Sequence, residues 1–239
     1  MKRMTDQNQT SAQMIDDFER RQAKYRPVAV ALADLHGQPQ WRKNTPPMDE
    51  LVSCILSQNT NDTNRDRGFD ALKAKYPDWQ AVVDAPTREL TDTIRVAGLA
   101  NQKAPRIQEV LRIIQAEQGD FDIDFLNELP IDEAKAWLTQ LPGVGPKTAA
   151  IVLCFAFGRP AFPVDTHVHR VSTRIGFLPP KVTADKAHPM MEAIVPPEDY
   201  YGFHINLIQH GRKVCNARSP HCERCPITEY CDYYQGLRL

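Results

Sequence analysis

Residues 141–174 read LPGVGPKTAAIVLCFAFGRPAFPVDTHVHRVSTR, and this stretch decides the fold of the 239-residue chain. Its first seven residues lie between two segments of helical periodicity, and Gly143 and Gly145 permit a tight hairpin with positive φ angles. Pro146 suits the first position of the next helix, which needs no backbone N–H donor. The stretch predicts two helices joined by a hairpin that offers N–H groups to a phosphate. A plain helix–helix connector is the alternative.

Lys147 and Asp165 are the candidate reactive groups of this stretch. A helix N-terminus disfavours a cation, so the neutral amine of Lys147, which can attack a sugar carbon and form a Schiff base, is more accessible there. Asp165 follows 18 residues later, so the chain can return and bring its carboxylate near the lysine. That carboxylate can stabilise a developing sugar cation or accept a proton. The alternatives are a solvated phosphate contact for Lys147 and a helix N-cap for Asp165.

A second motif lies near the C-terminus, where four cysteines have the spacing C-x6-C-x2-C-x5-C: Cys215, Cys222, Cys225 and Cys231. In a chain whose N-terminus lacks an apolar signal core, bunched cysteines bind metal more often than they form disulfides. Four thiolates within 17 residues can surround one iron–sulfur cube or one zinc ion. Zinc sites usually contain two C-x2-C pairs, whereas this motif contains one.

The composition allows a sizeable core and does not indicate a membrane protein. Hydrophobic residues make up 42% of the chain, and the net charge is −1. No apolar run is long enough to span a bilayer, and no secretion signal is evident, so we expect an intracellular, cytoplasmic protein. Residues 140–175 and 203–225 each carry four Lys or Arg and one acid. These segments predict one basic face for a polyanion, with an ordinary mixed surface as the alternative.

The periodicity of the remaining chain predicts an all-α protein. Apolar residues recur at helical spacing, for example at Ile107, Val110, Leu111 and Ile114, and prolines fall at the breaks between such segments. Residues 161–168 also fit a short strand, but Asp165 suits a first helical turn and favours a helix. We expect helices at residues 12–25, 48–58, 63–76, 87–96, 102–118, 131–140, 146–157, 164–174, 184–194 and 200–212.

The hairpin, the lysine, the aspartate and the cysteine motif together resemble endonuclease III, of the helix-hairpin-helix DNA glycosylases, over residues 47–233. The resemblance implies a six-helix barrel domain with the helix-hairpin-helix at residues 46–159. It also implies a cluster domain from residues 1–45 and 160–239, in which the four cysteines hold a [4Fe-4S] cluster. The DNA is expected between the two domains, and the cluster is expected to be structural, because glycosidic cleavage needs no electron.

The resemblance also implies an activity, a bifunctional DNA glycosylase and AP lyase of base excision repair. Such an enzyme flips an oxidised pyrimidine out of duplex DNA, because the sugar C1′ cannot be reached inside the stack. Lys147 is then the nucleophile that forms the Schiff base, Asp165 assists, and β-elimination nicks the strand. The protein is expected to act as a monomer on double-stranded DNA with a damaged base or an abasic site.

Further residues match DNA-contacting positions of the family. Leu99 falls where the family places an apolar wedge, with a core leucine as the alternative. Asn59, beside Gln58, stands where the family has a gap-filling glutamine; asparagine is shorter by one methylene, and a polar pair at a helix end is the alternative. Phosphate contacts are expected from the hairpin glycines and from Lys213 and Arg218, with Arg224 as a further partner. His167 stands where the family often has a histidine near the DNA, and a structural role is equally compatible with it.

Two other functions fit the same residues. One is a related enzyme that excises a mispaired or deaminated base such as uracil or thymine, or that acts mainly on abasic sites. The other is a DNA-binding cluster protein with little turnover, against which the presence of both Lys147 and Asp165 argues.

Overall fold

The structure is a computed structural model that describes residues 17–43 and 45–236. These residues form helices and connecting loops and include no strand, which confirms the all-α prediction. The chain divides into two compact units. We call Arg42–Pro163 the hairpin unit and the described residues before and after it the cysteine unit. The predicted barrel domain, residues 46–159, lies within the hairpin unit.

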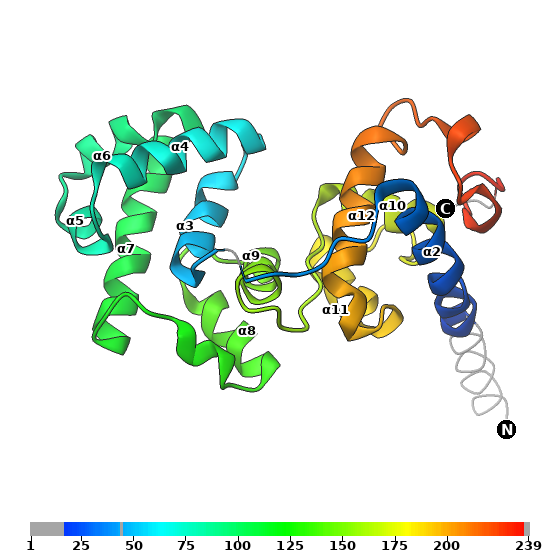
Figure 1. Cartoon of the computed structure of the whole chain (residues 1–239), viewed down its shortest axis with the longest axis horizontal. Helices are drawn as coiled ribbons and strands as arrows, with labels where there is room; N and C mark the ends of the chain where they lie inside the picture. The colour runs from blue at the N-terminus through cyan, green and yellow to red at the C-terminus, as the bar shows by residue number, and fades with distance from the viewer. Residues whose placement is uncertain (1–16, 44, 237–239) are drawn as a thin grey trace, which may run out of the picture. The chain divides into compact units, whose positions relative to one another are not determined.

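The hairpin unit is built from seven α-helices, labelled in Figure 1. They are α3 (Pro47–Ser57), α4 (Asp62–Lys75), α5 (Trp79–Asp84), α6 (Thr87–Thr93), α7 (Ala100–Gln118), α8 (Ile131–Gln140) and α9 (Pro146–Ile151). The last continues as a π-helix over Val152–Ala156, and 3₁₀ turns occur at Arg95–Ala97 and Asp124–Asn127.

The core of the hairpin unit comes from the apolar stripes of these helices. Ile107, Val110, Leu111 and Ile114 of α7 are fully buried, as their spacing predicts. They belong to one contiguous cluster with residues of α3, α6, α8 and α9. The loops between these helices, including the hairpin, are therefore held by a packed helical frame.

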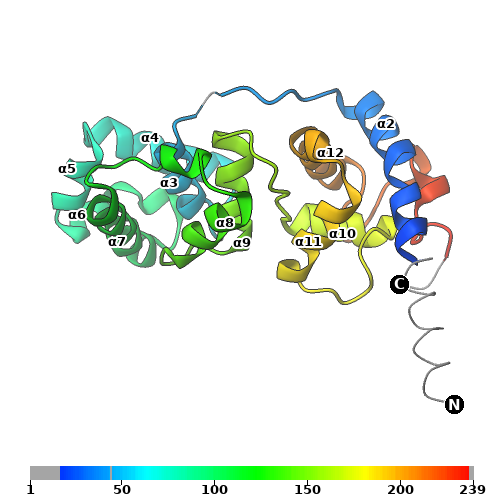
Figure 2. The ribbon, with the colours of Figure 1, turned by 90° about the horizontal axis from the view of Figure 1, so that it is seen from below.

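The cysteine unit combines both ends of the described chain. Residues 17–23 are helical and are followed by α2 (Tyr25–His36). After the hairpin unit come α10 (Thr166–Ile175), α11 (Ala184–Ile194) and α12 (Tyr200–Lys213), then 3₁₀ turns at Cys222–Arg224 and Thr228–Tyr230. Helix α12 lies beside α2 and α10 (Figures 1 and 2). Phe203 of α12 packs edge-on against Tyr25 of α2, with ring centroids 5.1 Å apart.

The helix predictions differ most from the structure in three places. The helix predicted at 12–25 begins outside the described residues, and a further helix, α2, follows it although Pro27 lies in its first turn. Proline is tolerated there, because the first turn donates no intrahelical hydrogen bonds. The sequence pattern does not predict the short α5, because six residues are too few to show a helical period. Residues 161–165 are neither strand nor helix, and α10 begins at Thr166, not at Val164.

The N-terminal helical segment is tied to the C-terminal part of the cysteine unit by one buried acid. Asp232 is paired with both Lys24 and Arg20, the latter at 3.2 Å between Nη1 and Oδ2. Lys24 Nζ also donates to the carbonyl of Ile175 at 2.9 Å. The described residues before the hairpin unit thus pack on the segment that carries the four cysteines.

Candidate DNA-repair site

The predicted hairpin connects α8 to α9. The Val144 N–H donates to the Leu141 carbonyl at 3.0 Å, and Gly143 has a φ of 74°, the left-handed region that favours glycine. Gly145 has a φ of −96° with an extended backbone, so the prediction of a positive φ is wrong there. Pro146 occupies the first position of α9, as predicted. One glycine is thus needed for the turn itself, while the other is exposed and leaves open space at its Cα.

Gln58 supports the hairpin from the end of α3. Its side-chain Nε2 donates to the Gly143 carbonyl at 2.9 Å, and its Oε1 accepts from Arg106 Nη1 at 3.3 Å. A Cβ added at Gly143 would come within 2.3 Å of Arg106 Cδ. The sequence predicts a DNA contact for Gln58 and no role for Arg106. The structure places both side chains against the hairpin.

Lys147 is exposed on the first turn of α9. Among residues 17–43 and 45–236 its ammonium makes no hydrogen bond or ion pair. Helix α9 packs against α3, where the buried Cys54 thiol donates to Glu50 Oε1 at 3.6 Å. Burial raises the pKa of both groups, and the charge of Lys147 opposes the rise at Cys54. Lys147 therefore presents an amine that no described residue engages, near a thiol–carboxyl pair.

Asp165 lies in the cysteine unit and is the N-cap of α10. Its Oδ1 accepts the Val168 N–H at 2.7 Å. Within the described chain no other hydrogen bond to this carboxylate is formed, so one of its two oxygens remains available. The side chain is half-buried. Asp165 therefore caps α10 through one carboxylate oxygen, and its other oxygen is available for chemistry.

Leu99 and Asn59 stand on strained turns of the hairpin unit. Their φ angles are 48° and 53°, and the third positive-φ residue among the described non-glycines, Lys181, belongs to the other unit. Leu99 is 45% exposed, so the alternative of a core leucine is wrong. It borders an open hollow of about 270 Å³ with Arg95 and Asn101. Asn59 is also exposed. Strain of this kind persists where the surrounding structure imposes it, commonly at functional sites.

The other predicted DNA contacts lie on the cysteine unit. Arg218 is exposed in the loop after Cys215, and Lys213 is exposed at the end of α12, where its Nζ donates to Gln209 Oε1 at 3.0 Å. His167 is half-buried, with its Nδ1 3.1 Å from Arg170 Nη2, and burial lowers its pKa. The structure thus gives His167 a packing role beside its predicted contact with DNA.

The four cysteines of the C-terminal motif line one small apolar hollow: Cys215, Cys222, Cys225 and Cys231. All four are free of disulfides. Among the described residues no three potential ligands are close enough to hold a single metal ion. Burial raises the pKa of Cys225 to about 11 and also raises those of Cys222 and Cys231. A cluster would be held by the thiolate forms of these cysteines, so the thiols would lose their protons on binding it. A soft, apolar four-thiol pocket fits an iron–sulfur cluster.

Arg174 of α10 holds the segment that enters the cysteine motif. Its guanidinium donates to the carbonyls of Asn216 and Ala217, both at 2.8 Å, and to Cys215 Sγ at 3.2 Å. The sequence predicts only a basic charge at Arg174. The residues around Arg174 give no signal of these hydrogen bonds, because the loop that it contacts lies more than 40 residues further along the chain.

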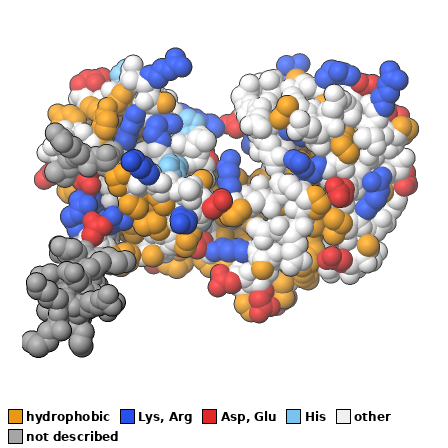
Figure 3. Space-filling model, turned by 180° about the vertical axis from the view of Figure 1, so that it is seen from behind, with side chains coloured by type: hydrophobic (Ala, Val, Ile, Leu, Met, Phe, Trp, Pro, Cys, Tyr) orange, Lys and Arg blue, Asp and Glu red, His pale blue; other side chains and the backbone are white. Residues whose placement is uncertain are grey.

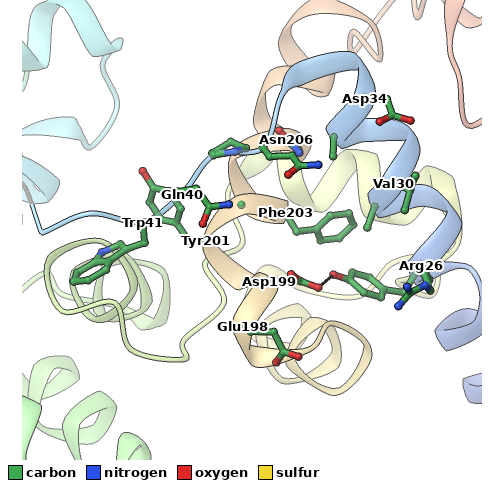
Figure 4. Close-up of a pocket in the computed structure, with 16 residues that line it drawn as sticks. Arg26, Val30, Asp34, Gln40, Trp41, Glu198, Asp199, Tyr201, Phe203 and Asn206 are labelled. Carbon is green, nitrogen blue, oxygen red and sulfur yellow. Dashed lines mark hydrogen bonds between the residues drawn. The ribbon is translucent and has the colours of Figure 1, made fainter.

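A separate pocket of about 550 Å³ lies in the cysteine unit between α2, residues 38–41 and the start of α12 (Figure 4). Tyr25 at its edge donates to Asp199 Oδ2 at 2.6 Å. None of the predicted site residues lines it. On the face in Figure 3, Lys and Arg side chains are interspersed with acidic ones over both units, so the single basic face stays a prediction. No described helix is long and apolar enough to span a membrane.

Comparison with known proteins places this geometry in a family. Residues 52–197 match the model of the HhH-GPD superfamily of base excision DNA repair proteins. Residues 215–231, which hold the four cysteines, match the iron-sulfur binding domain of endonuclease III. This second match confirms the prediction of a [4Fe-4S] cluster in place of zinc.

Relatives and solved structures agree with these matches. Endonuclease III of Thermotoga maritima is 35% identical over 82% of this chain and 88% of its own. Endonuclease III of Escherichia coli K12 is 32% identical over 91% and 99%. The structure of a trapped endonuclease III–DNA covalent intermediate has a TM-score of 0.77 at 30% identity, covering 90% of this chain and 97% of that chain. The chain therefore belongs to the endonuclease III family of DNA glycosylases, within the HhH-GPD superfamily.

Proposed function

We propose that this DNA glycosylase is bifunctional: it removes oxidised pyrimidines from duplex DNA and then nicks the strand by β-elimination. The observation that carries the proposal is the exposed amine of Lys147, which no described residue engages, on the first turn after the hairpin. A glycosylase that uses water needs no such amine, whereas one that also acts as a lyase needs a nucleophilic nitrogen to hold the sugar. A solved relative is a trapped endonuclease III–DNA covalent intermediate.

Lys147 would act as the nucleophile. Its neutral Nζ attacks C1′ of the flipped nucleotide, and the base leaves with the electron pair of the glycosidic bond and takes up a proton. The sugar ring opens and C1′ becomes a protonated Schiff base of Lys147. Loss of a C2′ proton then expels the 3′ phosphate, and water releases the lysine. The helix N-terminus favours the neutral amine that begins this sequence.

Asp165 would assist from the cysteine unit. The developing charge on the sugar is positive, so a nearby carboxylate lowers the energy of the transition state. The same group can take the proton that Lys147 loses on attack. Because Oδ1 is engaged as the cap of α10, the second oxygen is the one expected to face the sugar.

The same proposal assigns the DNA contacts. The hairpin with Gly143 and Gly145 would bind backbone phosphate through N–H groups and read no sequence. Leu99 would enter the helix as the wedge, and Asn59 would fill the space of the flipped base. On the cysteine unit, Lys213, Arg218 and His167 would contact the strand. The enzyme would act as a monomer, in the cytoplasm beside the nucleoid.

The cluster would support this work without taking part in it. Cys215, Cys222, Cys225 and Cys231 would hold the iron, and the bound cluster supplies rigid cross-linking of a segment with little apolar core. The loop that begins at Cys215 would then present Arg218 to DNA phosphates. Arg174 holds the same loop by its bonds to two backbone carbonyls.

Borohydride trapping tests the proposal. Wild-type protein, incubated with a duplex that contains an oxidised pyrimidine or an abasic site, should give a covalent protein–DNA adduct. Lys147→Ala should give none, while Lys73→Ala, which removes another exposed lysine of the hairpin unit, should react as wild type. The absence of an adduct with wild type, or an undiminished adduct with Lys147→Ala, would contradict the lysine mechanism.

One alternative substrate has a specific basis. The structure of a thermostable thymine-DNA glycosylase has a TM-score of 0.75 and is 26% identical, covering 91% of this chain. Duplexes with a uracil or thymine opposite guanine therefore belong in the same experiment. Faster excision from these duplexes than from oxidised pyrimidines would assign the protein to mismatch repair instead.

A further inference from the structure

Lys103 is a fully buried lysine for which the proposed chemistry has no use. It lies in the first turn of α7 and has no exposed surface. Its Nζ donates to the Leu56 carbonyl at 2.6 Å and to the Ala97 carbonyl at 2.7 Å. No acid accepts from it among the described residues. A buried lysine without a carboxylate partner is costly, so its place in the core needs a reason.

The two carbonyls are the open ends of two helical segments. Leu56 is near the end of α3, and Ala97 ends the 3₁₀ turn that precedes α7. Carbonyls at such ends have no partner within their own helix, and a lysine can supply one. Lys103 therefore links the ends of two helical segments that are more than 40 residues apart in the sequence.

Each of these ends leads directly into a strained residue. Asn59 follows Leu56 by three positions and has a φ of 53°; Leu99 follows Ala97 by two and has a φ of 48°. They are the only positive-φ non-glycine residues described in the hairpin unit. Both side chains are exposed. One buried nitrogen thus lies behind both turns that carry the proposed wedge and gap filler.

We propose that Lys103 is a positioning residue that holds the Leu99 turn and the Asn59 turn in fixed register, so that both side chains enter duplex DNA together. This inference rests on the proposed roles of Leu99 and Asn59 and adds the device that couples them. Lys103 acts through these two turns and touches no substrate. Prearranged turns lower the ordering cost of DNA entry, and a small misplacement of either turn lowers the rate of flipping.

The chemistry of the lysine suits this task. Burial lowers its pKa, and even a neutral amine keeps two N–H donors, the number of carbonyls it meets. The side chain can therefore hold both carbonyls in either protonation state.

Gln108, five residues after Lys103 in α7, is a matched control. It is also buried, and its Nε2 donates to the carbonyls of Val82 and Ala85 at 3.0 and 2.7 Å. It ties α7 to α5 and the residue after it, a part of the chain that carries neither turn. A substitution at Gln108 thus removes comparable buried donors without touching the proposed wedge or gap filler.

The test compares two substrates that need the same chemistry. An abasic site in single-stranded DNA needs no wedge and no gap filler, whereas an abasic site in a duplex needs both. Lys103→Met keeps most of the length of the side chain and removes its donors. We expect Lys103→Met to slow borohydride trapping on the duplex by about tenfold to a hundredfold and to leave single-strand trapping within about twofold of wild type.

The control separates positioning from general stability. Gln108→Met should change trapping on the two substrates equally, if at all. An equal loss on both substrates with Lys103→Met, or no loss on either, would overturn the inference. Wild-type protein that traps neither substrate would instead overturn the proposed lyase function, so the two failures are distinguishable.

Two further variants keep the inference testable if Lys103→Met fails to fold. Lys103→Gln retains amide donors and should recover part of the duplex reaction. In the Leu99→Ala background, Lys103→Gln should slow trapping on the duplex by a smaller factor than it does in the wild-type background, because Lys103 acts through the turn that Leu99 occupies. If the two substitutions slow duplex trapping by independent factors, the proposed coupling is overturned.

Discussion

The hairpin unit and the cysteine unit differ in what holds their functional residues. In the hairpin unit, Lys147 lies on the first turn of α9 and Leu99 on the turn before α7, and both helices pack on a contiguous apolar core. In the cysteine unit, the described chain after α12 has only two 3₁₀ turns, and Arg174 holds its first loop by bonds to backbone carbonyls. The first arrangement follows from the apolar pattern of the helices. The second is incomplete without its cluster, so the two units should respond differently to the same kinds of change.

The largest expected effect concerns Asp165, the residue of the cysteine unit proposed to act in the chemistry. Asp165→Asn should slow base excision about a hundredfold to a thousandfold, because the carboxylate charge is lost. Asparagine caps helices about as well as aspartate, so the melting temperature should stay near that of wild type. Single-turnover base release and thermal unfolding measure the two quantities. Normal excision by the folded variant would leave Asp165 as a cap alone.

Removal of a cluster ligand should disturb the cysteine unit and leave the hairpin unit unchanged. Cys225→Ser should lower the iron content and increase hydrogen exchange in residues 214–236, because this segment has few apolar contacts of its own. Exchange in the core of α7 should be unchanged. Cys154→Ser, which changes a buried cysteine of the hairpin unit, should retain iron. Full iron content and unchanged exchange with Cys225→Ser would show that the segment does not depend on the cluster.

Arg218 tests the loop of the cysteine unit at a smaller scale. Arg218→Ala should weaken duplex binding a few-fold and reduce the salt slope of the binding constant by about 0.9, the value for one lost phosphate contact. Arg88→Ala, which changes an exposed arginine of α6, is the control. Titrations at several salt concentrations measure both. An unchanged slope would remove Arg218 from the DNA contacts.

The smallest expected effect belongs to Glu50 in the hairpin unit. Burial raises its pKa above the ordinary value, so the folded state binds its proton more tightly than the unfolded state. Stability should therefore fall as the pH rises from the ordinary pKa through the raised one. Glu50→Gln should then be more stable than wild type at neutral pH by on the order of 1 kcal/mol. Denaturant unfolding across this range checks it, with exposed Glu109→Gln as the control. If the difference in unfolding free energy between Glu50→Gln and wild type is the same at all pH values, Glu50 does not ionise in this range with a raised pKa.

Features that depend on neighbouring residues could be predicted from the sequence. Gly143, Pro146 and the cap at Asp165 are local, since each depends on the conformation of a few adjacent residues. The regular spacing of Ile107 and Leu111 likewise predicts a buried face of α7. The cysteine spacing, with the family resemblance, predicts the cluster.

Contacts between distant parts of the chain could not be predicted in this way. Arg106, Lys103 and Arg174 are charged residues within helices, a pattern that ordinarily indicates a solvated face. Each instead bonds a group far away in the sequence, and no local signal marks that partner. The predicted DNA contact of Gln58 misses its bond to Gly143 for the same reason, because that bond joins segments more than 80 residues apart.

The most direct measurement of the central claim is to locate the covalent bond. Wild-type protein trapped with borohydride on an abasic duplex is digested, and mass spectrometry identifies the peptide that carries the DNA remnant. We predict that the remnant is on Lys147, in the hairpin unit. A remnant on another amine, with Lys147 unmodified, would contradict the assignment of the chemistry to the hairpin.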